Sequence, residues 1–127
     1  MSGKTYILVN RKPLLCEDIL KWAVWFQTAN RVVAHTLLTD LEPRERAKAI
    51  LAGEFKARAT VSTVFLGTDV SFGDIPILFE TVVFAEGSPL DGHQDRYPTW
   101  EVAEDSHQKA VRMVQQLHPN WRVTRGG

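Results

Sequence analysis

The sequence predicts an α+β domain, with an antiparallel sheet of about four strands and two main helices packed on one face of it. Two β-rich runs, residues 60–66 and 77–85, flank a short polar loop, which is typical of a long hairpin. Two amphipathic segments, residues 17–29 and 99–117, each need an apolar surface to cover. We expect the element order β-α-β-(α)-β-β-α in a single domain spanning residues 1–127.

The first strand is predicted at residues 5–9, where β-branched residues alternate with others. Residues 17–29 then form a helix, because two acidic residues stand at its start, where the helix macrodipole favours negative charge. This helix is apolar on two sides, and Trp22 and Trp25 lie on the second one. These tryptophans are therefore expected at a subunit interface or, as the alternative, in the core or at its half-exposed rim.

A second strand is predicted at residues 31–39, and a short helix follows at 43–54 with a proline in its first turn. Residues 87–98 are rich in Gly, Pro and Asp and are expected to form a loop.

The last helix, residues 99–117, is capped by Thr99. Its apolar stripe is expected to consist of Ala103, His107, Ala110, Val111, Val114 and Leu117. The end of the chain, residues 122–127, is expected to be a flexible tail, with a short strand over 121–125 as the alternative.

Charge and composition argue for a soluble, cytoplasmic protein. Acidic and basic residues balance at 15 each, which argues against a broad nucleic-acid surface because such surfaces are rich in Lys and Arg. A local basic patch is still expected around Arg44, Arg46, Lys48, Lys56 and Arg58. The zero net charge also makes a homodimer the default expectation. Only one cysteine is present, and no run approaches the ~20 apolar residues that span a bilayer.

Glu80 is the most suggestive candidate for chemistry. If residues 66 and 77 pair in the hairpin, Glu80 lies opposite Thr63, on a half-buried strand face where desolvation raises the pKa of a carboxyl. The alternative is that Glu80 lies on the solvent face, or that Arg58 or Lys56 neutralises it.

The hairpin loop offers oxygen ligands from Asp69, Ser71 and Asp74, although these residue types are also those that any turn uses. The four histidines are too scattered for a metal-ligand motif, so we expect no metal and no cofactor.

Aromatic and basic residues near the end of the chain could clamp single-stranded nucleic acid or a nucleotide, although such aromatic residues more often anchor packing. They are Tyr97, Trp100 and Trp121, with Arg96, Arg122 and Arg125.

The runs KPLLCEDILKWAVWF, VSTVFLGTDVSFG, IPILFETVVF and RYPTWEVAEDSHQKAV resemble a family of small, mostly uncharacterised proteins encoded by phages and prophages. The resemblance covers most of residues 12–114. In that family the hairpin reads close to VSTVFLGxDHxFG and LLFETMVFGG, and the last helix reads close to RYSTWEEAExGH. The matching positions are Asp69, Phe72, Gly73, Glu80, Arg96, Trp100, Glu104 and His107.

Two positions depart from the family pattern. Val70 stands where the family often has histidine, which weakens any metal or proton-transfer role for the loop. Residues 40–57 look like an inserted helical segment, and such a segment is a natural place for a protein-specific partner to bind.

The leading hypothesis is a non-catalytic phage accessory protein that binds a host or defence-system protein. Its expected contacts are Trp22 and Trp25, together with Arg44, Arg46 and Lys48 in the inserted segment. The alternative is a small-ligand-binding or hydrolytic domain with a pocket formed by Asp69, Glu80, Arg96 and His107.

Overall fold

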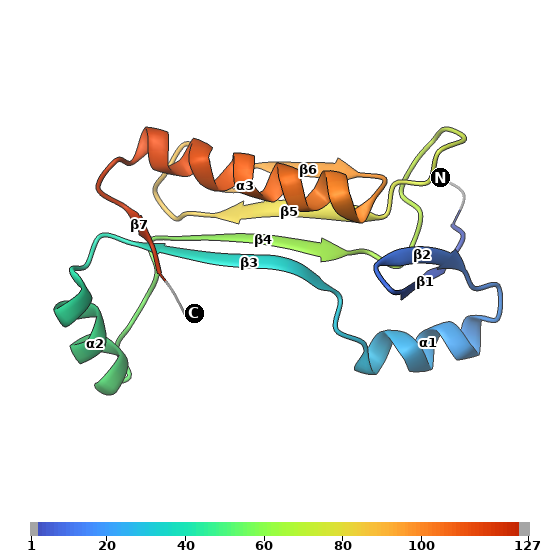
Figure 1. Ribbon diagram of the computed structural model, residues 1–127, viewed down its shortest axis with the longest axis horizontal. Coiled ribbons are helices and arrows are strands. Elements are labelled where there is room, and N and C mark those ends of the chain that lie inside the picture. The colour runs from blue at the N-terminus through green and yellow to red at the C-terminus, as the bar shows by residue number, and fades with distance from the viewer. Residues whose placement is uncertain (1–2, 125–127) are drawn as a thin grey trace.

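Five antiparallel strands form the main sheet of the molecule (Figure 1). The structure is a computed structural model that describes residues 3–124. Across the sheet, the strands follow the order β6 (Gln94–Tyr97), β5 (Phe79–Phe84), β4 (Ala59–Phe65), β3 (Val32–Thr39) and β7 (Arg122–Val123). The predicted α+β class is confirmed, and the predicted hairpin supplies the central pair, β4 and β5.

The longest helix, α3 (Trp100–Leu117), covers one face of this sheet (Figure 1). Thr99 caps its start as predicted, because the Thr99 hydroxyl accepts a hydrogen bond from the backbone N–H of Val102. Leu117, which the sequence places in the apolar stripe, remains exposed at the end of the helix. The other members of the predicted stripe are buried: Ala103, His107, Ala110, Val111 and Val114.

A polar layer divides the core between α3 and the sheet. His107 is fully buried, and its Nε2 and Nδ1 atoms lie 2.8 Å from Thr36 Oγ1 and 2.7 Å from Thr63 Oγ1. The Thr63 hydroxyl is also hydrogen-bonded to the Thr81 hydroxyl. Both ring nitrogens therefore have a hydroxyl partner, which satisfies a neutral imidazole.

Two apolar clusters lie on either side of this polar layer. One cluster is aliphatic and consists of Leu38, Ala59, Val61, Val83, Ala85, Ala110, Val111 and Val114. The other cluster is largely aromatic and consists of Phe65, Leu78, Phe79, Tyr97 and Ala103.

The N-terminal strand lies outside the main sheet, which corrects the expected four-strand arrangement. β1 (Tyr6–Val9) pairs with β2 (Lys12–Leu15) in a separate two-stranded hairpin. The turn residues Asn10 and Arg11 have φ values of 51° and 67°, the left-handed conformation that tight hairpin turns use. The hairpin is attached to the end of β4, because the N–H of Tyr6 donates to the carbonyl of Gly67 at 2.8 Å.

Helix α1 (Ile19–Thr28) packs against β1, beyond the end of the sheet, so the predicted packing on one sheet face holds for α3 only (Figure 1). Only residues 16–18 separate β2 from α1, and this short connection keeps the helix beside the hairpin. The Asp18 side chain caps the helix by accepting hydrogen bonds from the N–H groups of Leu20 and Lys21.

Two short strands form the sheet edges, and only β6 was not predicted. β6 lies within residues 87–98, which were expected to form a loop, because its sequence QDRY lacks the apolar alternation of a typical strand. β7 lies within residues 121–125, where a short strand was the alternative to a flexible tail, and it pairs with Leu38 and Thr39 of β3, so the alternative is confirmed. Residues 125–127 of that tail lie outside the described residues.

Helix α2 (Pro43–Leu51) connects β3 to β4 and stands away from the sheet (Figure 1). Proline occupies its first turn, as predicted. The helix ends at Leu51 rather than at residue 54, because the chain turns at Gly53, where φ is 70°. None of the helices described between residues 3 and 124 has the continuous apolar length that spanning a bilayer requires.

The buried imidazole predicts a pH dependence of stability. Burial, with a smaller contribution from His35, lowers the pKa of His107 below its usual value. The unfolded chain therefore binds more protons than the folded one as the pH falls below about 6.5. We expect the free energy of unfolding to be highest above this pH and to decrease progressively below it.

Urea unfolding at about pH 7.5 and about pH 5.5 tests this prediction. The decrease in stability on acidification should be smaller in His107→Gln, which keeps a donor and an acceptor but cannot titrate. The control His93→Gln, in the loop before β6, should retain the full decrease. An equal decrease in His107→Gln and the wild type would contradict the prediction.

Candidate protein-interaction site

The face of the sheet opposite α3 carries Glu80, the residue with the strongest sequence signal for chemistry. The Glu80 carboxylate accepts hydrogen bonds from Arg96 Nε at 2.9 Å and from Gln94 Nε2 at 2.6 Å. Arg96 lies directly across the strand pair from Glu80. Arg96, rather than Arg58 or Lys56, therefore neutralises Glu80.

His107 lies on the other face of the sheet, so it cannot share a pocket with Glu80. The expected register placed Glu80 opposite Thr63, but Glu80 pairs with Val64, and Thr63 pairs with Thr81. A shift of one residue exchanges the two faces of a strand. The pocket expected from Asp69, Glu80, Arg96 and His107 is therefore not formed.

Asp69 organises the loop between β4 and β5. Its side chain is 3% exposed, and its Oδ1 atom accepts hydrogen bonds from the N–H groups of Ser71 at 2.8 Å and Ile77 at 3.0 Å. These contacts are those of an Asx turn, the alternative that the sequence left open. Among the described residues, no group of three or more His, Cys, Asp or Glu side chains is placed to hold a metal ion.

Trp22 and Trp25 are half-buried, as the alternative of core or rim positions expects, and their place at a subunit interface stays a prediction. Trp22 Nε1 donates to the carbonyl of Tyr6 at 3.0 Å. The Trp25 ring meets the edge of Phe65, with 5.9 Å between the ring centres. The tryptophans therefore anchor α1 to the hairpin and to the end of the core, the second of the two expected locations.

The solvent side of α1 is nevertheless apolar. Ile19, Leu20 and Val24 are 58%, 76% and 68% exposed. A shallow groove of about 420 Å³ runs along this side and is lined by Leu20, Lys21, Val24 and Trp25. This surface belongs to the predicted interface helix, and one of the two predicted tryptophans, Trp25, forms it together with the aliphatic side chains of Leu20 and Val24.

Helix α2 exposes its apolar side chains in an unusual way. Ile50 and Leu51 are 56% and 89% exposed, and Pro43 and Ala47 on the same side of the helix are also exposed. The half-buried positions of α2 are Ala49, opposite the stripe, and Arg46, one turn before Ile50 at one edge of the stripe. The apolar stripe therefore faces away from the body of the protein, although such a stripe normally packs against the core.

Ion pairs hold the base of α2 against the sheet. Arg122 donates two hydrogen bonds to Glu42, at 2.8 and 2.7 Å. These bonds lower the pKa of the Glu42 carboxyl and raise the pKa of the Arg122 guanidinium. A second pair joins Arg58 to Asp40 at 3.0 Å, and its hydrogen bond lowers the pKa of the Asp40 carboxyl. Polar contacts rather than buried apolar surface therefore connect α2 to the rest of the chain.

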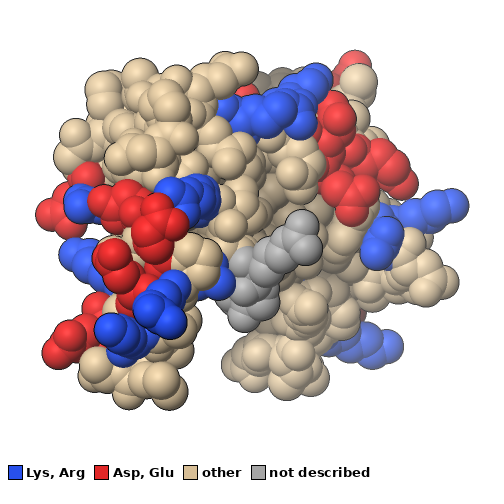
Figure 2. Space-filling model, turned by 60° about the vertical axis from the view of Figure 1, so that its left-hand side comes forward, with Lys and Arg blue, Asp and Glu red and all other residues tan. Residues whose placement is uncertain are grey.

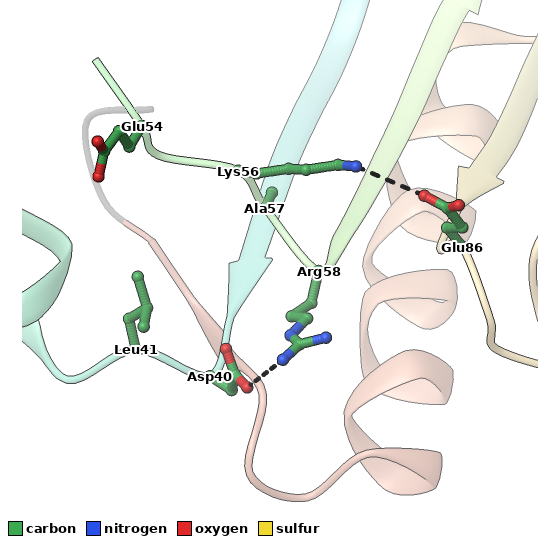
Figure 3. A pocket seen from close by; sticks show the side chains of 7 residues that line it. All are labelled: Asp40, Leu41, Glu54, Lys56, Ala57, Arg58 and Glu86. Atoms are coloured by element: carbon green, nitrogen blue, oxygen red, sulfur yellow. Dashed lines mark hydrogen bonds and ion pairs between the residues drawn. The ribbon is translucent and has the colours of Figure 1, made fainter. Parts of the chain in front are cut away.

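A cleft of about 380 Å³ lies where α2 leaves the sheet (Figure 3). Figure 3 shows the Asp40–Arg58 ion pair and a second pair between Lys56 and Glu86, which are 3.5 Å apart. Both cations in the cleft are thus already paired with carboxylates of this chain. Of the expected basic patch, Lys56 and Arg58 are neutralised in this way, whereas Arg44 and Lys48 lie exposed on α2.

The surface around α2 mixes charges of both signs. Figure 2 turns the side with α2 forward, and Lys and Arg side chains are interspersed there with Asp and Glu, unlike the basic stripe that binds nucleic acid. The aromatic and basic residues that could clamp a nucleic acid or nucleotide are instead engaged in other contacts. Tyr97 is buried, Trp121 stacks on His118 with 3.7 Å between the ring centres, and Arg122 is paired with Glu42. Arg125 lies outside the described residues.

Comparisons with protein-family models, curated proteins and solved structures find no match to this chain. The resemblance to phage-encoded proteins therefore stays a prediction from the sequence.

Two apolar side chains outside the predicted contacts are also exposed. Phe72 and Ile75 are 89% and 69% exposed in the loop that Asp69 organises. In the run SFGDIPI, Gly73 and Asp74 lie between Phe72 and Ile75. Gly and Asp are typical of turns, so the run indicates a turn with an apolar residue on either side.

The contact between α1 and Gly67 generates a testable prediction. Gly67 has a φ of 78°, and a Cβ atom there would lie 3.0 Å from Phe26 Cε2 and 3.3 Å from Trp22 Cζ2. Gly87 has a similar φ of 84°, but a Cβ atom there would meet nothing within 4 Å. We therefore expect Gly67→Ala to destabilise the protein more than Gly87→Ala, whose cost is backbone strain of about 1–2 kcal/mol.

Chemical denaturation of the two variants, monitored by tryptophan fluorescence, measures this difference. Equal losses of stability would mean that α1 is not packed closely against Gly67.

Proposed function

We propose that this protein is a non-catalytic binding protein that occupies a surface of another protein through helix α2. The observation that carries the proposal is the apolar stripe of α2, which faces solvent with Leu51 89% exposed. Large apolar side chains in a globular domain normally lie against the core, and an exposed set of them marks an interaction site.

The length of α2 supports the same conclusion. Isolated helices shorter than about 12–15 residues are marginal in water, and most helices in proteins are stabilised by packing of their apolar face. α2 has nine residues, none of them buried, and is attached to the sheet chiefly by the ion pairs at its base. A partner that covers the apolar stripe would supply the missing packing.

The chemistry of the stripe defines the kind of partner. Arg44 and Lys48 are exposed along one flank of the stripe, whereas Arg46 is half-buried at the other flank, one turn before Ile50. A helix with an apolar face binds in an apolar groove, and two basic residues beside it favour acidic residues at the rim of that groove. Arg44 and Lys48 thus stay in the proposed contact.

The biological setting of this proposal comes from the sequence resemblance. A phage or prophage protein of this size that binds another protein is an accessory factor, and its partner is a host or defence-system protein. The separation of the candidate catalytic side chains supports a non-catalytic role, because Glu80 is paired with Arg96 while His107 is enclosed on the opposite face.

Capture experiments with surface variants test the role of α2. The tagged wild-type protein should retain a specific protein from a bacterial host lysate, and its affinity should then be measured with the purified partner. Leu51→Glu should weaken binding by roughly 10- to 100-fold, because it removes one buried leucine side chain from the contact. Arg44→Glu combined with Lys48→Glu should slow association and reduce its dependence on salt.

Two control variants on α3 separate this effect from general changes of the surface. Val102→Glu introduces a charge at a side chain that is 45% exposed, and Arg112→Glu reverses an exposed charge. Both should bind as the wild type does. Unchanged binding by Leu51→Glu would exclude α2 as the contact.

A further inference from the structure

We propose that a cavity between β6 and α3 binds a free amino acid, with the ammonium group of the ligand at Asp95 and its carboxylate at Lys109. The cavity has a volume of about 150 Å³ and lies where the edge strand contacts the helix. None of its lining residues belongs to α2, so the inference goes beyond the proposed function and does not depend on the partner of α2.

Alternate residues at β6 and one side of α3 form the walls of the cavity. His93, Asp95 and Tyr97 line it from the strand side, because side chains two positions apart in a strand lie on the same face. The helix contributes residues that recur every three or four positions, which is the spacing of one helix face. These residues are Ser106, Lys109, Ala110 and Met113. Thr81 of β5 completes the lining.

Two of the lining residues are buried polar side chains. Thr81 is fully buried, and its hydroxyl is hydrogen-bonded to the Thr63 hydroxyl, which in turn is bonded to His107. The cavity therefore adjoins the polar layer of the core. Tyr97 is 8% exposed, and within residues 3–124 its hydroxyl makes no hydrogen bond. Buried polar groups nearly always have a partner, and a polar molecule in the cavity would supply one.

The other polar side chains of the lining also have capacity to bind. Among the described residues, no side-chain hydrogen bond or ion pair engages His93, Asp95 or Ser106. Donors and acceptors from two elements thus line one cavity without satisfying each other, which favours a polar ligand over an apolar one.

The charges of the two walls define the class of ligand. Asp95 provides a carboxylate on the strand side, and Lys109 provides an ammonium group on the helix side. Lys109 is paired with Asp105 of its own helix at 3.1 Å, but an ammonium group has three donors and keeps two for a ligand. A simple anion would be repelled by Asp95 and a simple cation by Lys109, whereas a zwitterion is attracted by both.

The size of the cavity limits the ligand to a small one. A volume of about 150 Å³ equals that of about five water molecules and is below the roughly 300–1,000 Å³ of sites for drug-sized ligands. An amino acid with a short side chain is of this size. Ala110 and Met113 offer apolar surface to such a side chain, so alanine is the ligand of choice for a test.

Nuclear magnetic resonance titration of the ¹⁵N-labelled full chain with L-alanine tests this proposal. Saturable shifts should be confined to residues 93–97 and 106–113, with a dissociation constant between about 0.1 and 10 mM, because so small a ligand makes few contacts. Acetate and methylamine each carry only one of the two charges. Each should bind at least about 10-fold more weakly than alanine.

Charge variants identify the groups that hold the ligand. Asp95→Asn and Lys109→Gln should each weaken alanine binding by about 10-fold or more, because each removes one charged partner. Both side chains are exposed, so the variants should keep the spectrum of the folded protein outside the cavity. Asp105→Asn removes the carboxylate that competes for Lys109 and should bind alanine at least as tightly as the wild type.

The matched control is Glu101→Gln, which removes an exposed carboxylate from the first turn of α3 and should bind as the wild type does. The absence of saturable shifts up to about 50 mM alanine, shifts centred elsewhere, or equal binding by Asp95→Asn and the wild type would each overturn the proposal. Acetate or methylamine binding as tightly as alanine would overturn it too, because a single charge would then suffice. None of these variants alters α2, so each outcome leaves the proposal for α2 standing.

Discussion

The packing of α3 against the sheet is the interaction on which the rest of the structure depends. It joins two apolar clusters through a middle layer in which His107 is hydrogen-bonded to Thr36 and Thr63. These hydrogen bonds also restrict how α3 can lie, because a buried imidazole without its hydroxyl partners would be costly. Apolar burial therefore supplies most of the favourable energy, and the polar layer selects one position of the helix along the sheet.

Helix α3 and the sheet bury each other's apolar surfaces. The two other helices therefore keep apolar side chains that no part of residues 3–124 covers. α1 is anchored through Trp22 and Trp25, but Leu20 and Val24 face solvent. α2 lacks even that anchoring and is connected by ion pairs such as Arg122–Glu42. α2 contributes no buried residue to the core, and α1 contributes only from its inner side, through Trp25. The exposed sides of both helices can therefore serve as contact surfaces without weakening the fold.

The sequence was sufficient for features that depend on local signals. The helix at residues 99–117 could be predicted because its cap, Thr99, and its apolar period lie within the segment itself. The position of Glu80 relative to His107 could not be predicted, because it depends on the register of the hairpin. The observed register differs from the expected one by one residue, which places Glu80 on the face opposite His107. β6 was missed because a short polar edge strand has no apolar alternation. The direction of the α2 stripe depends on tertiary packing, which no local pattern reports.

Amide hydrogen exchange tests most directly whether the core is stable on its own and whether α2 is stabilised only by a partner. It is measured by mass spectrometry, first on the dilute protein and then on the protein with its captured partner. In the dilute protein, the amides of β4, β5 and α3 should exchange slowly, whereas those of residues 43–51 should exchange close to the rate of an unstructured chain. Adding the partner should protect residues 43–51 and leave the core unchanged. Strong protection of residues 43–51 in the dilute protein, or none in the complex, would contradict this account.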